Sequence, residues 1–102
     1  MLINVDPAIL AAQAASESGG AAVLAAAAAA AAGPTSAVVP PGADDVSVRA
    51  AAALIARSAA TTGILAEYIA MRELFAGAVG SSGATYTAVE AINVAATTIG
   101  GA

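Results

Sequence analysis

The chain contains an unbroken run of twelve apolar residues, positions 21–32, that consists mostly of alanine. Alanine has the highest helix propensity of all residues, so the run strongly favours a helix. Hydrophobic stabilisation scales with buried apolar area at about 25 cal/mol per Å², and the small alanine side chain therefore gains little from burial. The run is also shorter than the roughly 20 apolar residues that cross a bilayer. We expect a soluble helical protein with a thin core and no stable transmembrane segment.

Apolar residues make up 60% of the 102 positions, but aromatic side chains are limited to Tyr68, Phe75 and Tyr86. A chain of this length is enough for one small domain, 1–102. With so little area to bury it is marginal as an independent folder. This is the first indication that a partner supplies part of the fold.

The first helix has clear boundary signals. Asp6 can accept hydrogen bonds from the free N–H groups of a first helical turn, and Pro7 suits the first helical position because its missing donor would be unpaired there. Glycine and proline at 33 and 34 commonly follow a helix end. The sequence predicts a helix over about 7–32.

A proline-rich connector, 33–43, separates this helix from the next. Asp44 is predicted to cap the second helix, which runs over about 44–80 with acidic residues at the positive end of its dipole. The Gly-Ser-Ser-Gly sequence at 80–83 is expected to end this helix. The remainder, 81–102, is expected to form a tail in which residues 84–98 either make a short third helix or stay loose.

Large apolar residues fall on more than one face of the second helix. One set lies within about 120° on a helical wheel, which predicts a core stripe: Val46, Leu54, Ile64, Leu65, Tyr68, Met71, Phe75 and Val79. A second set lies outside that stripe: Val48, Ile55, Ile69 and Leu74. Scattered surface hydrophobes are common, but the scarcity of charge favours a second burial surface that marks an interface.

The composition excludes several classes of function. The net charge is −4, and the three basic residues are all arginine, so the clustered positive charge of a nucleic-acid binder is absent. Without His, Cys or Lys the usual catalytic bases and nucleophiles are missing. Asp44 and Asp45 are better explained by helix capping than by a metal site. We therefore predict no enzyme, no cofactor and no metal.

Three segments closely resemble the PE domain of mycobacterial PE proteins: DPAILAA at 6–12, VVPPGADDVS at 38–47 and SSGATY at 81–86. The connector segment is the most specific, and the resemblance covers nearly the whole chain. The chain departs from the family where Pro7-Ala8 replaces the Pro-Glu dipeptide that gives the family its name.

The resemblance implies an antiparallel two-helix hairpin that completes a four-helix bundle as a 1:1 heterodimer with a PPE protein. It also implies export by an ESX (type VII) secretion machinery, without a cleaved signal peptide, from the cytoplasm to the cell envelope or outside. The family's export signal is Tyr-x-x-x-Asp/Glu, which Tyr86 and Glu90 match. The alternative is an ordinary i,i+4 pair on a short helix.

The partner interface is predicted to involve six residues of the second helix: Ile64, Leu65, Tyr68, Met71, Phe75 and Val79. Two other functions stay open. The apolar excess also suits an envelope-associated protein that acts after export in solute passage or host contact, and a structural protein that self-associates through the same stripes.

Overall fold

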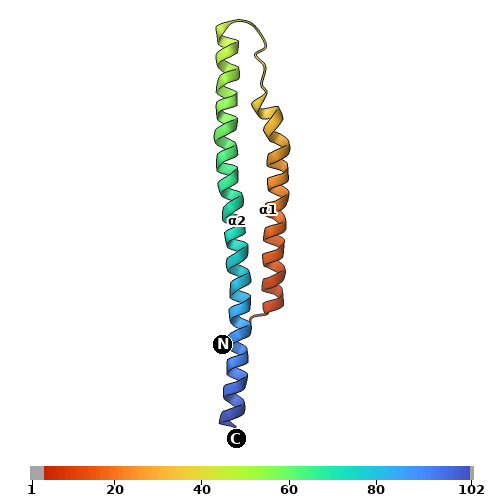
Figure 1. Cartoon of the computed structure of the whole chain (residues 1–102), viewed down its shortest axis with the longest axis vertical. Coiled ribbons are helices and arrows are strands. Elements are labelled where there is room, and N and C mark those ends of the chain that lie inside the picture. Colours follow the sequence, from red (N-terminus) through yellow and green to blue (C-terminus); the bar gives the residue numbers. More distant parts are fainter. Residues whose placement is uncertain (1–3, 102) are drawn as a thin grey trace. The chain divides into compact units, whose positions relative to one another are not determined.

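The computed structural model describes residues 4–101 and is all-helical over that range. Helix α1 comprises Pro7–Ser36 and helix α2 comprises Asp45–Gly100, with a short connector between them (Figure 1). Segments of α1 pack against segments of α2 in antiparallel order, since Leu10 meets Gly83 whereas Glu17 meets Arg72. The predicted all-α helical hairpin is confirmed. The four-helix bundle, which needs a partner, stays a prediction.

The hairpin divides into two compact units. The first, which we call the terminal unit, combines Met1–Gly19 with Arg72–Ala102. The second, the connector unit, is Gly20–Met71 and contains the rest of α1, the connector and the first part of α2.

Helix α1 begins at Pro7, and Asp6 caps it. The Asp6 Oδ1 atom accepts hydrogen bonds from the backbone N–H groups of Ala8 at 2.9 Å and Ile9 at 3.4 Å. First-turn N–H groups have no acceptor inside the helix, so a carboxylate at this position satisfies donors that would otherwise need water.

Asp44 performs the same role for α2. Its Oδ1 atom accepts the backbone N–H of Ser47 at 2.9 Å, and its Oδ2 atom accepts the Ser47 hydroxyl at 2.9 Å. The backbone hydrogen bond above all, and the hydroxyl after it, hold the pKa of Asp44 below its ordinary value, because they stabilise the ionised carboxylate. Asp45, the first residue of α2, pairs with Arg49 one turn later, as its i,i+4 spacing predicts.

The predicted end of the first helix at residue 32 is wrong, because α1 continues through Pro34 to Ser36. Hydroxyl groups bond back to carbonyls of the final turns: Thr35 Oγ1 donates to Ala31 O at 2.8 Å, and Ser36 Oγ donates to Ala32 O at 2.7 Å. The missing N–H of Pro34 removes one backbone hydrogen bond, and the hydroxyl bonds of the two residues that follow accompany the helix beyond it to Ser36.

The predicted end of the second helix at residue 80 is also wrong. α2 runs to Gly100, so residues 84–98 belong to it and form neither a separate helix nor a loose tail. Ser81 and Ser82 donate hydrogen bonds to carbonyls four residues back, at 2.8 and 2.9 Å, so their hydroxyl groups have acceptors inside the continuous helix.

Gly80 and Gly83 lie where α2 faces the first turns of α1 in the terminal unit. A Cβ atom on Gly83 would lie 3.3 Å from Leu10 Cβ and 3.4 Å from the Pro7 carbonyl oxygen, and one on Gly80 would lie 3.7 Å from Ala14 Cβ. The glycines therefore permit close helix packing and do not terminate the helix. This is why the Gly-Ser-Ser-Gly sequence at 80–83 wrongly predicted a helix end.

The core is thin, as the composition predicts. Among residues 4–101 the buried apolar side chains are alanines: Ala21 and Ala51 in the connector unit and Ala76 in the terminal unit. Most side chains of the expected core stripe of α2 are exposed and not buried between the two helices. Six of its eight members are more than half exposed: Val46, Leu54, Ile64, Tyr68, Met71 and Phe75. The other two, Leu65 and Val79, are half-buried.

Candidate partner-binding surface

The packing of the terminal unit determines which face of α2 is already occupied. Gly80 and Gly83 face Ala14 and Leu10 of α1. One turn further along, Arg72 forms a partly buried ion pair with Glu17 at 2.8 Å. Beside it, the Ser18 hydroxyl donates to Glu73 at 2.9 Å. On the α2 side this contact surface consists of small residues and one polar cluster, whereas α1 contributes Leu10.

A separate stripe of larger side chains lies on a neighbouring face of α2 in the same unit. Its members recur at intervals of three or four residues, which places them along one side of a helix: Phe75, Val79, Ser82, Tyr86 and Val89. Phe75 is 53% exposed, and Tyr86 and Val89 are exposed as well. Around Tyr86 the surface has a hollow of about 380 Å³, lined also by Ser81, Ser82, Thr85 and Val89.

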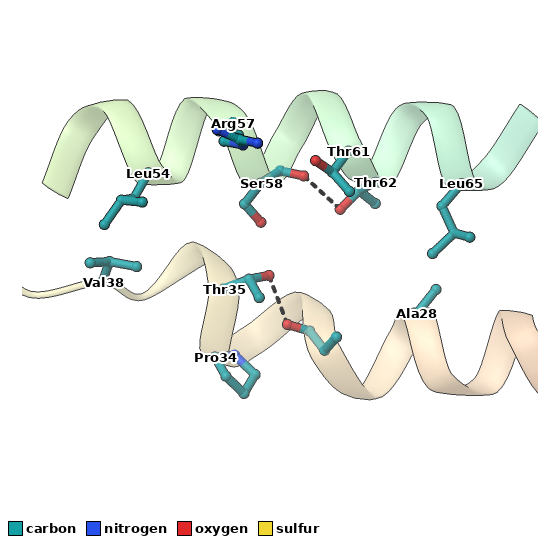
Figure 2. A pocket seen from close by; sticks show the side chains of 11 residues that line it. Ala28, Pro34, Thr35, Val38, Leu54, Arg57, Ser58, Thr61, Thr62 and Leu65 are labelled. Atoms are coloured by element: carbon teal, nitrogen blue, oxygen red, sulfur yellow. Dashed lines mark hydrogen bonds between the residues drawn. The ribbon is translucent and has the colours of Figure 1, made fainter. Parts of the chain in front are cut away.

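The connector unit exposes its own apolar side chains on α2. Ile64 is 68% exposed and Met71 is 64% exposed, and Tyr68 lies between them at helical spacing. Leu65 is half-buried because it turns toward α1, where it lies opposite Ala28 (Figure 2). The six predicted interface residues therefore lie on α2 in both units, four of them largely exposed and two half-buried.

Tyr86 and Glu90 lie one turn apart on α2 and are both exposed. Within the described residues 4–101 no hydrogen bond joins them. Their surroundings differ from the expected tail, because they form part of a continuous helix. α1 begins at Pro7 beside Gly83, so the C-terminal part of α2 that carries both residues runs past the start of α1 (Figure 1).

Sequence reasoning missed the apolar character of this extension. Val89, Ile92, Val94 and Ile99 are all exposed, and Ile99 reaches 78%. Apolar residues at 89, 92, 96 and 99 recur at intervals of three and four, which is a helical signal, but the glycines at 80 and 83 suggested that the helix had already ended.

The described surface exposes many apolar side chains and few ionisable ones. No group of three or more acidic side chains gathers at a possible metal site within residues 4–101. Both helices are long and apolar enough to cross a bilayer by length and composition alone. Core helices of soluble proteins and signal sequences pass the same test, so this property does not establish a membrane span.

Fold and surface together define a class of protein: a helical hairpin that, over residues 4–101, buries only alanine side chains and exposes most of its large apolar side chains along α2. Comparison with protein families identifies the group within this class. The PE family matches residues 3–93 of the 102, and the chain belongs to that family. The sequence-based assignment is thus confirmed. No curated protein and no solved structure matches the chain significantly.

Proposed function

We propose that this chain is one half of an obligate 1:1 heterodimer with a PPE-family protein, in which two hairpins form a four-helix bundle. The observation that carries the proposal is the mismatch between core and surface. Only alanine is buried inside the described hairpin, whereas Ile64, Tyr68, Met71 and Phe75 are each more than half exposed. Pairing between PE and PPE proteins in general supports the choice of partner.

The stabilisation available to such a complex is large compared with what the hairpin has alone. Full burial of a large apolar side chain contributes about 1.5–3 kcal/mol. Covering the exposed half of each of these four side chains therefore contributes on the order of 1 kcal/mol apiece. The isolated hairpin, with its alanine core, has few comparable contributions. This asymmetry favours a hairpin that becomes stable when it pairs.

The role that we propose is non-catalytic and ends in export. The pair leaves the cytoplasm through a type VII (ESX) secretion machinery, without a cleaved signal peptide, and reaches the cell envelope or the outside. Tyr86 and Glu90 supply the recognition signal. Their exposure on one helical turn supports this assignment, since both side chains are free to contact a receptor while α1 packs elsewhere.

The pairing is tested by light-scattering mass and circular dichroism on the chain expressed alone and together with a PPE-family protein. We expect a poorly folded or aggregated chain alone and a helical 1:1 complex on co-expression. A stable monomer or homodimer that ignores every PPE-family protein offered to it would overturn the proposal.

Export is tested separately by secretion of tagged variants from a host with a type VII system. Tyr86→Ala and Glu90→Gln are expected to abolish secretion and leave the purified complex intact. Ile92→Ala, a change at a similarly exposed position two residues beyond Glu90, serves as the control and should be secreted. Loss of the complex in Tyr86→Ala would instead make Tyr86 a structural residue.

The same exposed apolar surface also favours self-association, and an envelope role after export remains the further alternative. A helical homodimer in the light-scattering experiment would support the first. Flotation of the purified complex with lipid vesicles tests the second, and a complex that stays in the aqueous fraction counts against it.

A further inference from the structure

We propose that a groove in the connector unit receives a partner helix that carries a large apolar side chain and a carboxylate one turn apart, with the carboxylate paired to Arg57. The inference rests on the proposed pairing and names the chemical feature by which this chain selects its partner.

The groove lies between the last turns of α1 and the facing part of α2. It has a volume of about 470 Å³ and is lined by residues of both helices and of the connector. Figure 2 shows Leu54 opposite Val38 at one end and Leu65 opposite Ala28 at the other. Between these apolar ends all the lining side chains except Arg57 are alanine, proline, serine or threonine, so the helices leave space that neither of them fills.

Arg57 is the one charged residue among those that line this groove. Residues 20–43 and 50–66 contain no other charged side chain. The other two arginines are engaged, Arg49 with Asp45 and Arg72 with Glu17. Arg57 makes no hydrogen bond or ion pair with any residue of the described range 4–101. In a chain of net charge −4, the groove is thus a local positive site.

A helix that covers the groove removes water from Arg57. A buried charge without a counter-charge is strongly unfavourable, so an apolar or basic partner surface is rejected at this place. A carboxylate at the same place satisfies the guanidinium through a charge-assisted hydrogen bond. The groove accepts the large side chain, and Arg57 fixes the register of the helix that carries it.

Other occupants fit the groove less well. An acyl chain needs an enclosed apolar channel, but the middle of this groove is open and lined by the hydroxyl side chains of Thr35, Ser58, Thr61 and Thr62. A second copy of the chain brings another net charge of −4, and two such copies repel each other.

The first experiment locates the contact in the complex with a PPE-family protein. A photoreactive benzoylphenylalanine at position 61, one turn from Arg57 in the same groove, is cross-linked in the complex, and the site on the partner is mapped by mass spectrometry. We expect a cross-link within one helical turn of an Asp or Glu that has a large apolar residue three or four positions away. A cross-link to a segment without an acidic residue overturns the inference.

The second experiment measures affinity by competitive exchange into the same complex. Arg57→Glu is expected to weaken binding at least tenfold, and exchange of the mapped partner carboxylate for Lys is expected to restore it. Arg57→Lys keeps the charge and should bind nearly as the wild type. Arg49→Glu is the matched control, since Arg49 is an exposed arginine of α2 outside the groove. Circular dichroism of each complex checks that the helices are retained.

The outcomes separate the two proposals. If the wild-type chain pairs and Arg57→Glu pairs equally well, this inference is wrong and the heterodimer stands. If the wild-type chain pairs with no PPE-family protein, the proposed function fails and this inference fails with it. Cross-links to a second copy, or a fatty acid that native mass spectrometry finds on the wild type and not on Arg57→Glu, also overturn it.

Discussion

The close contact at Gly83 leads to a prediction that separates helix propensity from packing. Replacing glycine by alanine inside a helix stabilises it by about 1 kcal/mol when the new methyl group has room. At Gly77 a Cβ atom meets nothing within 4 Å, so Gly77→Ala should show this full gain. At Gly80 the nearest atom would be 3.7 Å away, an ordinary contact, and the gain should persist.

Gly83→Ala should behave differently. Its Cβ would lie 3.3 Å from Leu10 Cβ and 3.4 Å from the Pro7 carbonyl oxygen, and these atoms belong to the first turn of α1. Displacing packed atoms to admit a methyl group costs about 1–3 kcal/mol. Set against the gain in propensity, the net result is a change between zero and a loss of about 2 kcal/mol.

The assay is urea unfolding followed by circular dichroism, on the isolated chain where it is soluble and otherwise on its complex. We expect Gly77→Ala and Gly80→Ala to raise the unfolding free energy and Gly83→Ala to leave it unchanged or lower it. Gly83→Leu should be worse than Gly83→Ala in the same series. Equal stabilisation by all three alanine variants would refute the close approach of α1 to Gly83.

Three further predictions concern polar groups. Asp6→Ala should cost about 1 kcal/mol of stability by chemical denaturation, because the first-turn donors of α1 lose their acceptor, whereas Asp6→Asn should keep most of it. The lowered pKa of Asp44 means that its contribution is present above the unfolded-state value of 3.8 and is lost as the pH falls through the folded-state pKa; an acid titration of helicity should show this component in the wild type and not in Asp44→Asn. Arg72→Ala should lower the unfolding free energy by about 1–3 kcal/mol, since the partly buried Glu17 carboxylate loses its ion-pair partner and keeps the hydrogen bond from Gln13. The exposed Arg49→Ala should change it by less than about 1 kcal/mol.

Local capping chemistry made the helix starts predictable. Asp6-Pro7 and Asp44 act through hydrogen bonds within three residues of themselves, so a sequence pattern contains all the information needed. The helix ends were not predictable in the same way. Pro34 is followed by hydroxyl side chains that bond back to the last turns, and Gly83 is needed for the approach of Leu10, which is more than seventy positions away in sequence.

The assignment of faces failed for a related reason. A helical wheel identifies the core by the contrast between large apolar and polar residues. In this chain alanine appears on every face, and the seam between the helices uses Ala76, Gly80, Gly83 and the Glu17–Arg72 pair. Most of the large residues of α2 consequently mark a different surface from the one that joins the two helices, whereas Leu65 faces Ala28 of α1. The sequence located a continuous apolar stripe on α2 but could not show on which side of it α1 lies.

This division between a small-residue seam and a large-residue surface has an energetic consequence for assembly. Close packing of alanine and glycine holds two helices at short range but removes little apolar area from water, so the seam contributes modestly. The exposed half of a side chain such as Phe75 contributes only when a partner covers it. Truncating Phe75 should therefore destabilise a complex that covers it more than it destabilises the isolated hairpin. The proposed pairing would make folding depend on association, because most of the large apolar side-chain area lies on the surface that the partner would cover.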